Sequence, residues 1–206
     1  LNETADLAIH SAKDMPAQTT DELRHIYFIE DSPRKISDLI IFRKDCEAIF
    51  NKDMKLGTSS LRRKMQAKFH MSSGDISALN GNIDTRLKKL NDGLYDCIIL
   101  AEAGLSRLNY LLNDQSYIEL SHITCSGQGA LAVQWKKGSK VEEFLKSYLL
   151  IKSSDDLNKG IKMERELLIK LGANCNSAIS LHASEGILNG EIYGLEKFIK
   201  FSGNNV

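Results

Sequence analysis

The chain has 206 residues, of which 42% are hydrophobic and 26% charged, and its 27 basic side chains are balanced by 27 acidic ones. This composition is too apolar for a disordered chain and too charged for a membrane protein. Zero net charge argues against general nucleic-acid binding, which relies on a basic excess.

Hydrophobic periodicity predicts alternating strands and helices. In chain order we expect a strand at 5–9, a strand at 39–42, a helix at 59–69, a strand at 76–79, a helix at 84–90, a strand at 95–101, a helix at 103–112, a strand at 130–135, helices at 140–149 and 157–171, and strands at 178–182 and 187–193. Thr58 or Ser59 should cap the first helix, Gly93 should stop the second, and a turn at 184–186 should join the last two strands. This order predicts an α/β protein with mostly parallel pairing.

The four cysteines are Cys46, Cys97, Cys125 and Cys175. None forms a CxxC pair and no histidine lies at zinc-finger spacing, so we expect no metal site. A chain of this length does not need disulfides, which favours a reducing compartment.

Polar side chains follow the first predicted strand. His10, Ser11, Lys13 and Asp14 come directly after it, where ligands bind in open α/β sheets. The alternative is a plain turn closed by Pro16, and spacing alone leaves the two interpretations about even.

The segment Gly57–Arg63 (GTSSLRR) has the outline of an anion site. A glycine, hydroxyls and a helix start offer free N–H groups, and two arginines add bidentate donors. The alternative is an ordinary N-cap beside surface arginines. Two arginines in a first turn oppose the helix dipole, which favours an anionic ligand.

Three further segments are weaker indications of a functional site. Asn80–Leu87 is another turn with a glycine and an arginine. The paired glycines around Gln128 indicate a close backbone approach, a hinge or simply a tight turn. Cys175 lies in a polar loop after a predicted helix, where a thiol is more accessible than in a core.

Together these segments resemble the porphobilinogen deaminase (hydroxymethylbilane synthase) family. The resemblance runs from Ala5 to about Tyr193. Its motifs match at Asp6–Pro16, Gly57–Arg63, Gly81–Leu90, Asp96–Arg107, Gly127–Val133 and Cys175.

The resemblance implies a transferase of haem biosynthesis that condenses four porphobilinogen molecules head to tail and releases ammonia. It implies a dipyrromethane cofactor, held by Cys175 through a thioether, and Asp14 as the catalytic carboxylate. Further cofactor contacts are implied for Ser11, Lys13, Thr58, Ser60, Arg62, Arg63, Arg86 and Gln128. Substrate contacts are implied for Arg62, Arg86 and Arg107. Arg165 is expected to be structural, in a pair with Glu164 or Glu166.

The implied fold has three α/β domains: two lobes like those of periplasmic binding proteins, and a small domain that bears the cofactor. On this chain they correspond to 1–30 with 126–150, to 31–125 and to 151–206. The family pattern extends beyond both ends, so we expect parts of the first and third domains to be missing and the isolated 1–206 polypeptide to be inactive. Turnover by that polypeptide would refute this. A monomer is implied, in the cytoplasm or a plastid, with no nucleic-acid or membrane partner.

The chain departs from the family pattern at Asn80, usually arginine, at Ala178, usually proline, and at Glu102, usually small or apolar. The 172–174 loop, Gly-Ala-Asn, replaces the usual Glu-Gly-Gly. An alternative function is a two-lobe binding protein for an anionic small molecule, without catalysis. Asp14 and Cys175 separate the two hypotheses, because a plain receptor needs no loop thiol.

Overall fold

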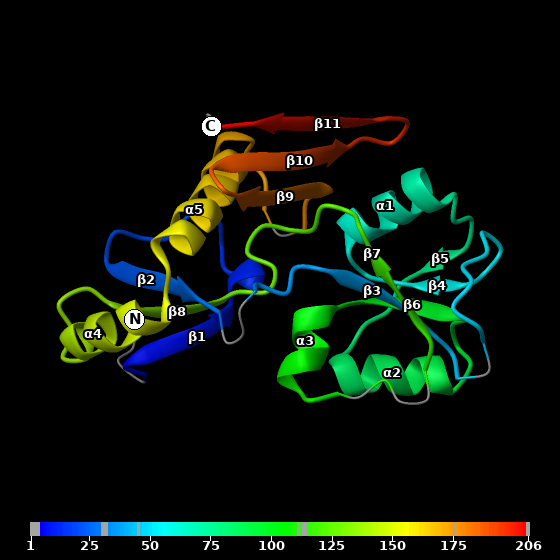
Figure 1. The fold of residues 1–206 in the computed structure, drawn as a ribbon, viewed down its shortest axis with the longest axis horizontal. Helices are drawn as coiled ribbons and strands as arrows, with labels where there is room; N and C mark the ends of the chain where they lie inside the picture. The colour runs from blue at the N-terminus through cyan, green and yellow to red at the C-terminus, as the bar shows by residue number, and fades with distance from the viewer. Residues whose placement is uncertain are drawn as a thin grey trace.

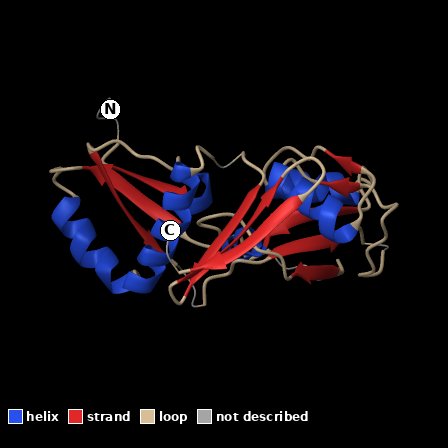
Figure 2. Cartoon of the chain, turned by 90° about the horizontal axis from the view of Figure 1, so that it is seen from above, coloured by secondary structure: helices blue, strands red, loops and turns tan. Residues whose placement is uncertain are grey.

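The computed structural model describes residues 5–29, 33–44, 46–110, 112, 115–174 and 176–204, with the backbone alone for 149–152. The expected α/β architecture is confirmed. The described part forms three sheets with helices packed on their faces, drawn out along one long axis (Figures 1 and 2). Every described helix is too short or too polar to cross a membrane.

The N-terminal sheet has antiparallel strands in the order β1 (Leu7–Ser11), β8 (Leu131–Lys136) and β2 (Leu23–Phe28). Helix α4 (Glu142–Lys152) packs on one face, where Leu145 joins a buried cluster with alternate residues of β8. Helix α5 (Asp155–Lys170) packs on the other face, where Ile161 clusters with Tyr27. A single turn of 3₁₀ helix, η1 (Ala12–Asp14), continues from β1.

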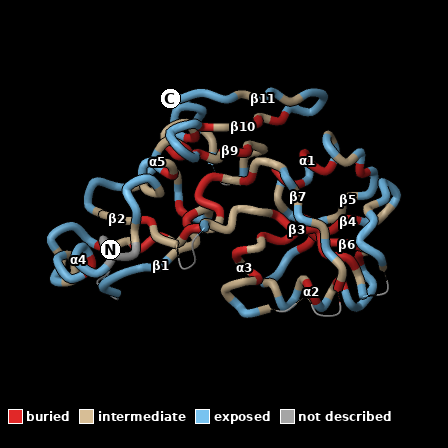
Figure 3. The backbone as a smooth tube through the Cα atoms, in the orientation of Figure 1, coloured by how far each residue is buried: buried red, intermediate tan, exposed pale blue. Residues whose placement is uncertain are grey.

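The central sheet has the strand order β5 (Ile76–Ser77), β4 (Leu56–Gly57), β6 (Cys97–Ala101), β3 (Asp38–Phe42) and β7 (Tyr117–Leu120). Its helices are α1 (Leu61–Met71), α2 (Ile83–Asn91) and α3 (Glu102–Arg107). Ala67 of α1 shares a buried cluster with Ile40, whereas Leu87 of α2 clusters with Ile41. Neighbouring residues of β3 therefore face opposite layers, and every residue of β3 and β6 is buried (Figure 3).

The C-terminal sheet is a meander of β9 (Ile179–Ser184), β10 (Ile187–Tyr193) and β11 (Phe198–Gly203). Leu168 of α5 packs against Leu181 of β9. Because Ile161 of α5 belongs to the N-terminal sheet's cluster, this helix connects the two sheets. The predicted turn between β9 and β10 is confirmed, with Glu185 and Gly186 both at positive φ, as a tight hairpin requires.

The prediction of mostly parallel pairing is wrong. Only β4–β5 and β4–β6 are parallel among the described strands, and the other six pairings are antiparallel. The pattern missed β2, β4, β7 and β11, and three of these are half-exposed edge strands with mixed polarity. Helical crossovers through α1 and α2 connect the parallel strands β4, β5 and β6, whereas the hairpins β9–β10 and β10–β11 and the other non-helical connections give antiparallel pairs.

Most element ends differ from the expected ones by a few residues, and two of the differences are informative. The cap of α1 is Ser60, whose Oγ accepts a hydrogen bond from the Arg63 amide, and not Thr58 or Ser59. The helix expected at 103–112 ends at Arg107. Gly93 has φ +77° and follows α2, as predicted.

Candidate functional site

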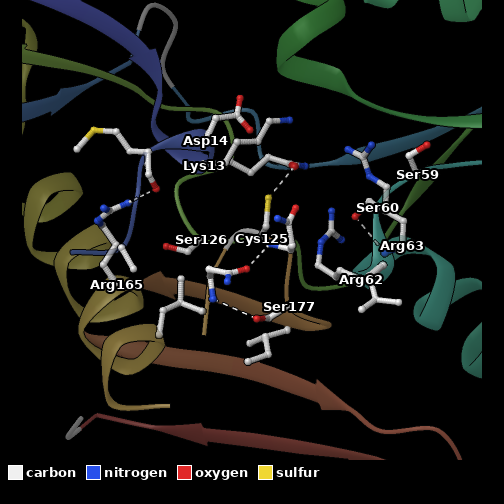
Figure 4. A pocket seen from close by; sticks show the side chains of 18 of the residues that line it. Lys13, Asp14, Ser59, Ser60, Arg62, Arg63, Cys125, Ser126, Arg165 and Ser177 are labelled. Atoms are coloured by element: carbon white, nitrogen blue, oxygen red, sulfur yellow. Dashed lines mark hydrogen bonds between the residues drawn. The ribbon is translucent and has the colours of Figure 1, made fainter. Parts of the chain in front are cut away.

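A cavity of about 490 Å³ lies where the three sheets approach one another (Figure 4). Its size lies in the usual range for small-molecule sites. Its charged and polar lining residues are Lys13, Asp14, Ser59, Ser60, Arg62, Arg63, Arg86, Cys125, Ser126, Gln128, Arg165, Asn174, Asn176 and Ser177. They come from η1, from the start of α1, from α2, from α5 and from the loop after α5. The others lie in the segment 125–130 before β8, which contains Gly127 and Gly129 and is called the glycine turn below.

The glycine turn holds η1, and therefore Asp14, in place. Ala12 donates its amide to the Ala130 carbonyl at 3.0 Å. Gly127 and Gly129 have φ of +73° and +83°. A Cβ atom at Gly127 would lie 2.8 Å from the Ala12 carbonyl carbon, and one at Gly129 would lie 2.2 Å from the Lys35 carbonyl oxygen. The close-approach interpretation of the paired glycines is confirmed.

We expect Gly129→Ala to lower the free energy of unfolding by about 2–4 kcal/mol, because a left-handed backbone and a backbone clash add together. Gly138→Ala is the matched control, since Gly138 has φ +73° but nothing within 4 Å of its Cβ position. That variant should lose about 1 kcal/mol. Urea unfolding measures both, and equal losses would contradict the close approach.

Arg62 and Arg63 share one buried carboxylate. Asp38, only 2% exposed, accepts hydrogen bonds from Arg62 Nη2 at 2.8 Å and from Arg63 Nη2 at 2.7 Å. Arg63 also donates Nε to Asp38 and Nη1 to the Ile99 carbonyl, and Arg62 Nη1 donates to Gln66. Much of the donor capacity of both arginines is therefore used inside the protein.

The ion pairs dominate the protonation of Asp38. Burial alone would raise the pKa of its carboxyl, but Arg63 and Arg62 outweigh that effect and hold the pKa well below its ordinary value. Gln128, fully buried, donates Nε2 to Asp38 at 2.8 Å and accepts from the Cys125 thiol at 3.3 Å.

Other cations of the cavity are not balanced in this way. Burial, and secondarily Arg63, lower the pKa of Lys13. The same two causes lower the pKa of Arg86. Burial disfavours the charged forms of Lys13 and Arg86, and the positive charge of Arg63 adds to this, so an anionic ligand would stabilise both cations.

Seven of the predicted site residues line the cavity: Lys13, Asp14, Ser60, Arg62, Arg63, Arg86 and Gln128. Ser11, Thr58 and Arg107 do not. Thr58 is buried and accepts a hydrogen bond from the Ser60 amide, and Arg107 donates to the Gly129 carbonyl at 3.2 Å. Cys175 lies outside the described residues, while Asn174 and Asn176 on either side of it line the cavity.

The expected pairing of Arg165 with a neighbouring glutamate is wrong. Glu164 pairs with Arg34 at 3.2 Å, and Glu166 lies 3.7 Å from Lys162. Arg165 instead donates Nη1 to the Met15 carbonyl at 3.4 Å and lines the cavity. The Lys162–Glu166 pair has the local i,i+4 spacing, but the partner of Glu164 lies 130 positions away and is set by packing.

Sequence reasoning also missed Ser126, which lines the cavity, and Asp38, which pairs its arginines. At the departure Asn80, the side-chain Oδ1 accepts a hydrogen bond from Ser59 Oγ at 2.8 Å. Ser59 lines the cavity and Asn80 does not, so Asn80 contacts the cavity lining through Ser59.

Among solved structures, the chain is similar to an amino acid ABC transporter substrate-binding protein from Streptococcus pneumoniae bound to L-arginine. The match has 16% identity and a TM-score of 0.39, and covers 82% of this chain and 64% of that one. A likeness this distant carries no argument about ligand or activity.

Among curated proteins, the chain is 37% identical over 178 residues to a probable porphobilinogen deaminase of Methanocaldococcus jannaschii, covering 85% of this chain and 59% of that protein. It is 35% identical over 204 residues to the porphobilinogen deaminase of Streptococcus sanguinis, covering 94% and 63%. The chain thus spans about three fifths of the length of these relatives. Residues 1–143 match the family model of the porphobilinogen deaminase dipyromethane cofactor binding domain. The chain belongs to the porphobilinogen deaminase family.

Proposed function

We propose that the protein is a hydroxymethylbilane synthase, which condenses four porphobilinogen molecules head to tail and releases one ammonia at each step. One observation carries the proposal: the exposed carboxylate of Asp14 lines the same cavity as two cations with lowered pKa values, Lys13 and Arg86. The residues on either side of Cys175 line this cavity too. A receptor for anions would need the cations alone.

The lining residues fit the cofactor that this function requires. Dipyrromethane carries four carboxylates, and burial and the nearby Arg63 lower the pKa values of Lys13 and Arg86. Arg165 Nη2 and Ser126 Oγ are buried and have no hydrogen-bond partner among the residues that the structure describes. We propose that Cys175 anchors the group and that Lys13, Ser60 and Arg86 bind its carboxylates. When bound, it supplies the pyrrole ring on which the product chain is extended.

In this proposal Asp14 acts on the substrate. Loss of ammonia from porphobilinogen leaves positive charge on the pyrrole, shared by its N–H group. A fixed carboxylate that accepts a hydrogen bond from this N–H stabilises the charge as it develops. Asp14 can also accept the proton lost from the ring carbon at which each new bond forms, and in its protonated form donate a proton to the leaving amine.

Asp38 organises the cavity from behind. Its single negative charge compensates one of the two positive charges of Arg62 and Arg63, and its hydrogen bonds hold both guanidinium groups at the start of α1. One net positive charge is left beside the cavity that both arginines line. The repeated addition of units with two carboxylates each explains why so many cations surround one catalytic carboxylate.

The mass of the intact protein, purified at its natural length, tests the proposal. We expect a mass higher than the sequence mass by two linked pyrrole units, and loss of this increment in Cys175→Ala. Cys125→Ala is the matched control, because Cys125 also lines the cavity and should leave the increment in place. An unmodified wild-type protein that folds but does not consume porphobilinogen would favour the two-lobe binding protein.

The proposal includes a monomer that acts on a small molecule in the cytoplasm or in a plastid, without nucleic-acid or membrane partners. This part of the proposal rests on the family relationship. The molar mass in solution, measured by light scattering, tests whether the protein is a monomer.

A further inference from the structure

Two polar side chains of the cavity lack a partner for one of their atoms. Within the part of the chain that the structure describes, Arg165 Nη2 and Ser126 Oγ are buried without a hydrogen bond. The two residues are only 7% and 8% exposed, and both line the cavity. In Figure 4 they lie on one side of Cys125, and Arg62 and Arg63 lie on the other.

Their neighbours do not supply the missing partners. Both glutamates beside Arg165 on α5 face other cations, Arg34 and Lys162. The remaining contacts of the Arg165 guanidinium are the Met15 carbonyl and the ring of Tyr27, whose centroid lies 6.0 Å away. A carbonyl and an aromatic face hold the guanidinium in position, but they do not neutralise it.

A buried cation without a counter-ion is unfavourable, and so is a buried hydroxyl without a partner. Such groups are rare in native proteins and call for an explanation. For two donors that line one cavity, a bound ligand that completes them is a direct explanation. The contrast with Arg62 and Arg63 is direct, because those arginines have Asp38. The α5 side of the cavity therefore has donors available where the α1 side has largely used its own.

We propose that Arg165 and Ser126 form a carboxylate-binding subsite on the α5 side of the cavity, which takes a carboxylate side chain of the pyrrole ligand. This rests on the proposed function. The guanidinium supplies a charge-assisted hydrogen bond and the hydroxyl a neutral one, so Arg165 should contribute more than Ser126.

The carboxylate could belong to the incoming substrate or to the anchored cofactor, and two measurements separate these sources. The first is the KM for porphobilinogen, compared with the inhibition constant of 2-(aminomethyl)pyrrole, which has no carboxylates. The second is the fraction of the purified protein that carries the two-pyrrole mass increment. Both are made on wild type, Arg165→Gln, Ser126→Ala and Lys162→Gln, with melting temperatures recorded alongside.

If the subsite holds substrate, Arg165→Gln should raise the KM about tenfold or more and Ser126→Ala about threefold, with kcat little changed. Neither should alter inhibition by 2-(aminomethyl)pyrrole. If it holds the cofactor, the loaded fraction should fall in the same order of severity. Lys162→Gln removes a cation from the same helix that does not line this cavity, and should change neither quantity.

A purely structural Arg165 would lower the melting temperature and leave both quantities unchanged. That result, together with an unaffected Ser126→Ala variant, would overturn the subsite while the proposed function stands. A wild-type protein with neither turnover nor the mass increment would overturn both.

Discussion

Asp38→Asn should lower the free energy of unfolding by about 3–5 kcal/mol at neutral pH. The carboxylate is buried at the start of β3 and accepts from Arg62, Arg63 and Gln128. Asparagine leaves two guanidinium groups, 4% and 7% exposed, without a counter-ion. The effect is large because the two guanidinium groups are almost fully buried. Urea unfolding followed by circular dichroism measures it.

The free energy of unfolding measured at acidic pH is a second test of the ion pairs between Asp38 and the two arginines. The folded-state pKa of Asp38 is depressed below its ordinary value of 3.8. Its contribution is therefore complete above that value and is lost as the pH falls through the folded pKa. Wild type should lose this stability on acidification, and Asp38→Asn should lack that part of the pH dependence.

Asp92→Asn is the matched control for Asp38. Asp92 pairs with Lys88 at 2.6 Å, but both side chains are about half exposed or more. The loss should stay below about 0.5 kcal/mol. Similar losses in the two variants would contradict the importance of the buried cluster.

Asp14→Asn should reduce turnover of porphobilinogen about a hundredfold or more, because it removes the charge and the proton acceptor but keeps the shape. Asp14 is exposed at the end of η1, so the fold and the two-pyrrole mass increment should persist. Steady-state rates and intact mass measure the two effects separately.

Asp21→Asn serves as the control for Asp14, since Asp21 is an exposed acid before β2 that does not line the cavity. It should leave the rate unchanged. A near-normal rate in Asp14→Asn would remove this carboxylate from the mechanism.

Local chemistry made much of the site predictable. Paired glycines permit backbone angles that other residues rarely adopt, and Gly127 and Gly129 have such angles. Asp14, Lys13, Arg62, Arg63 and Arg86 follow strand ends or begin helices, and all line the cavity. The edge strands β2, β7 and β11 escaped prediction because half-exposed strands carry a weak apolar pattern.

The sequence by itself determined the family, the α/β class and most of the residues around the cavity, since each depends on motifs or on spacing within one segment. Only the tertiary structure decided which charges are already paired. Asp38 meets arginines 24 and 25 positions away, and Glu164 meets Arg34 across 130 positions, which leaves Arg165 without a carboxylate. Such pairings follow from how the three sheets pack together, and no local pattern encodes them.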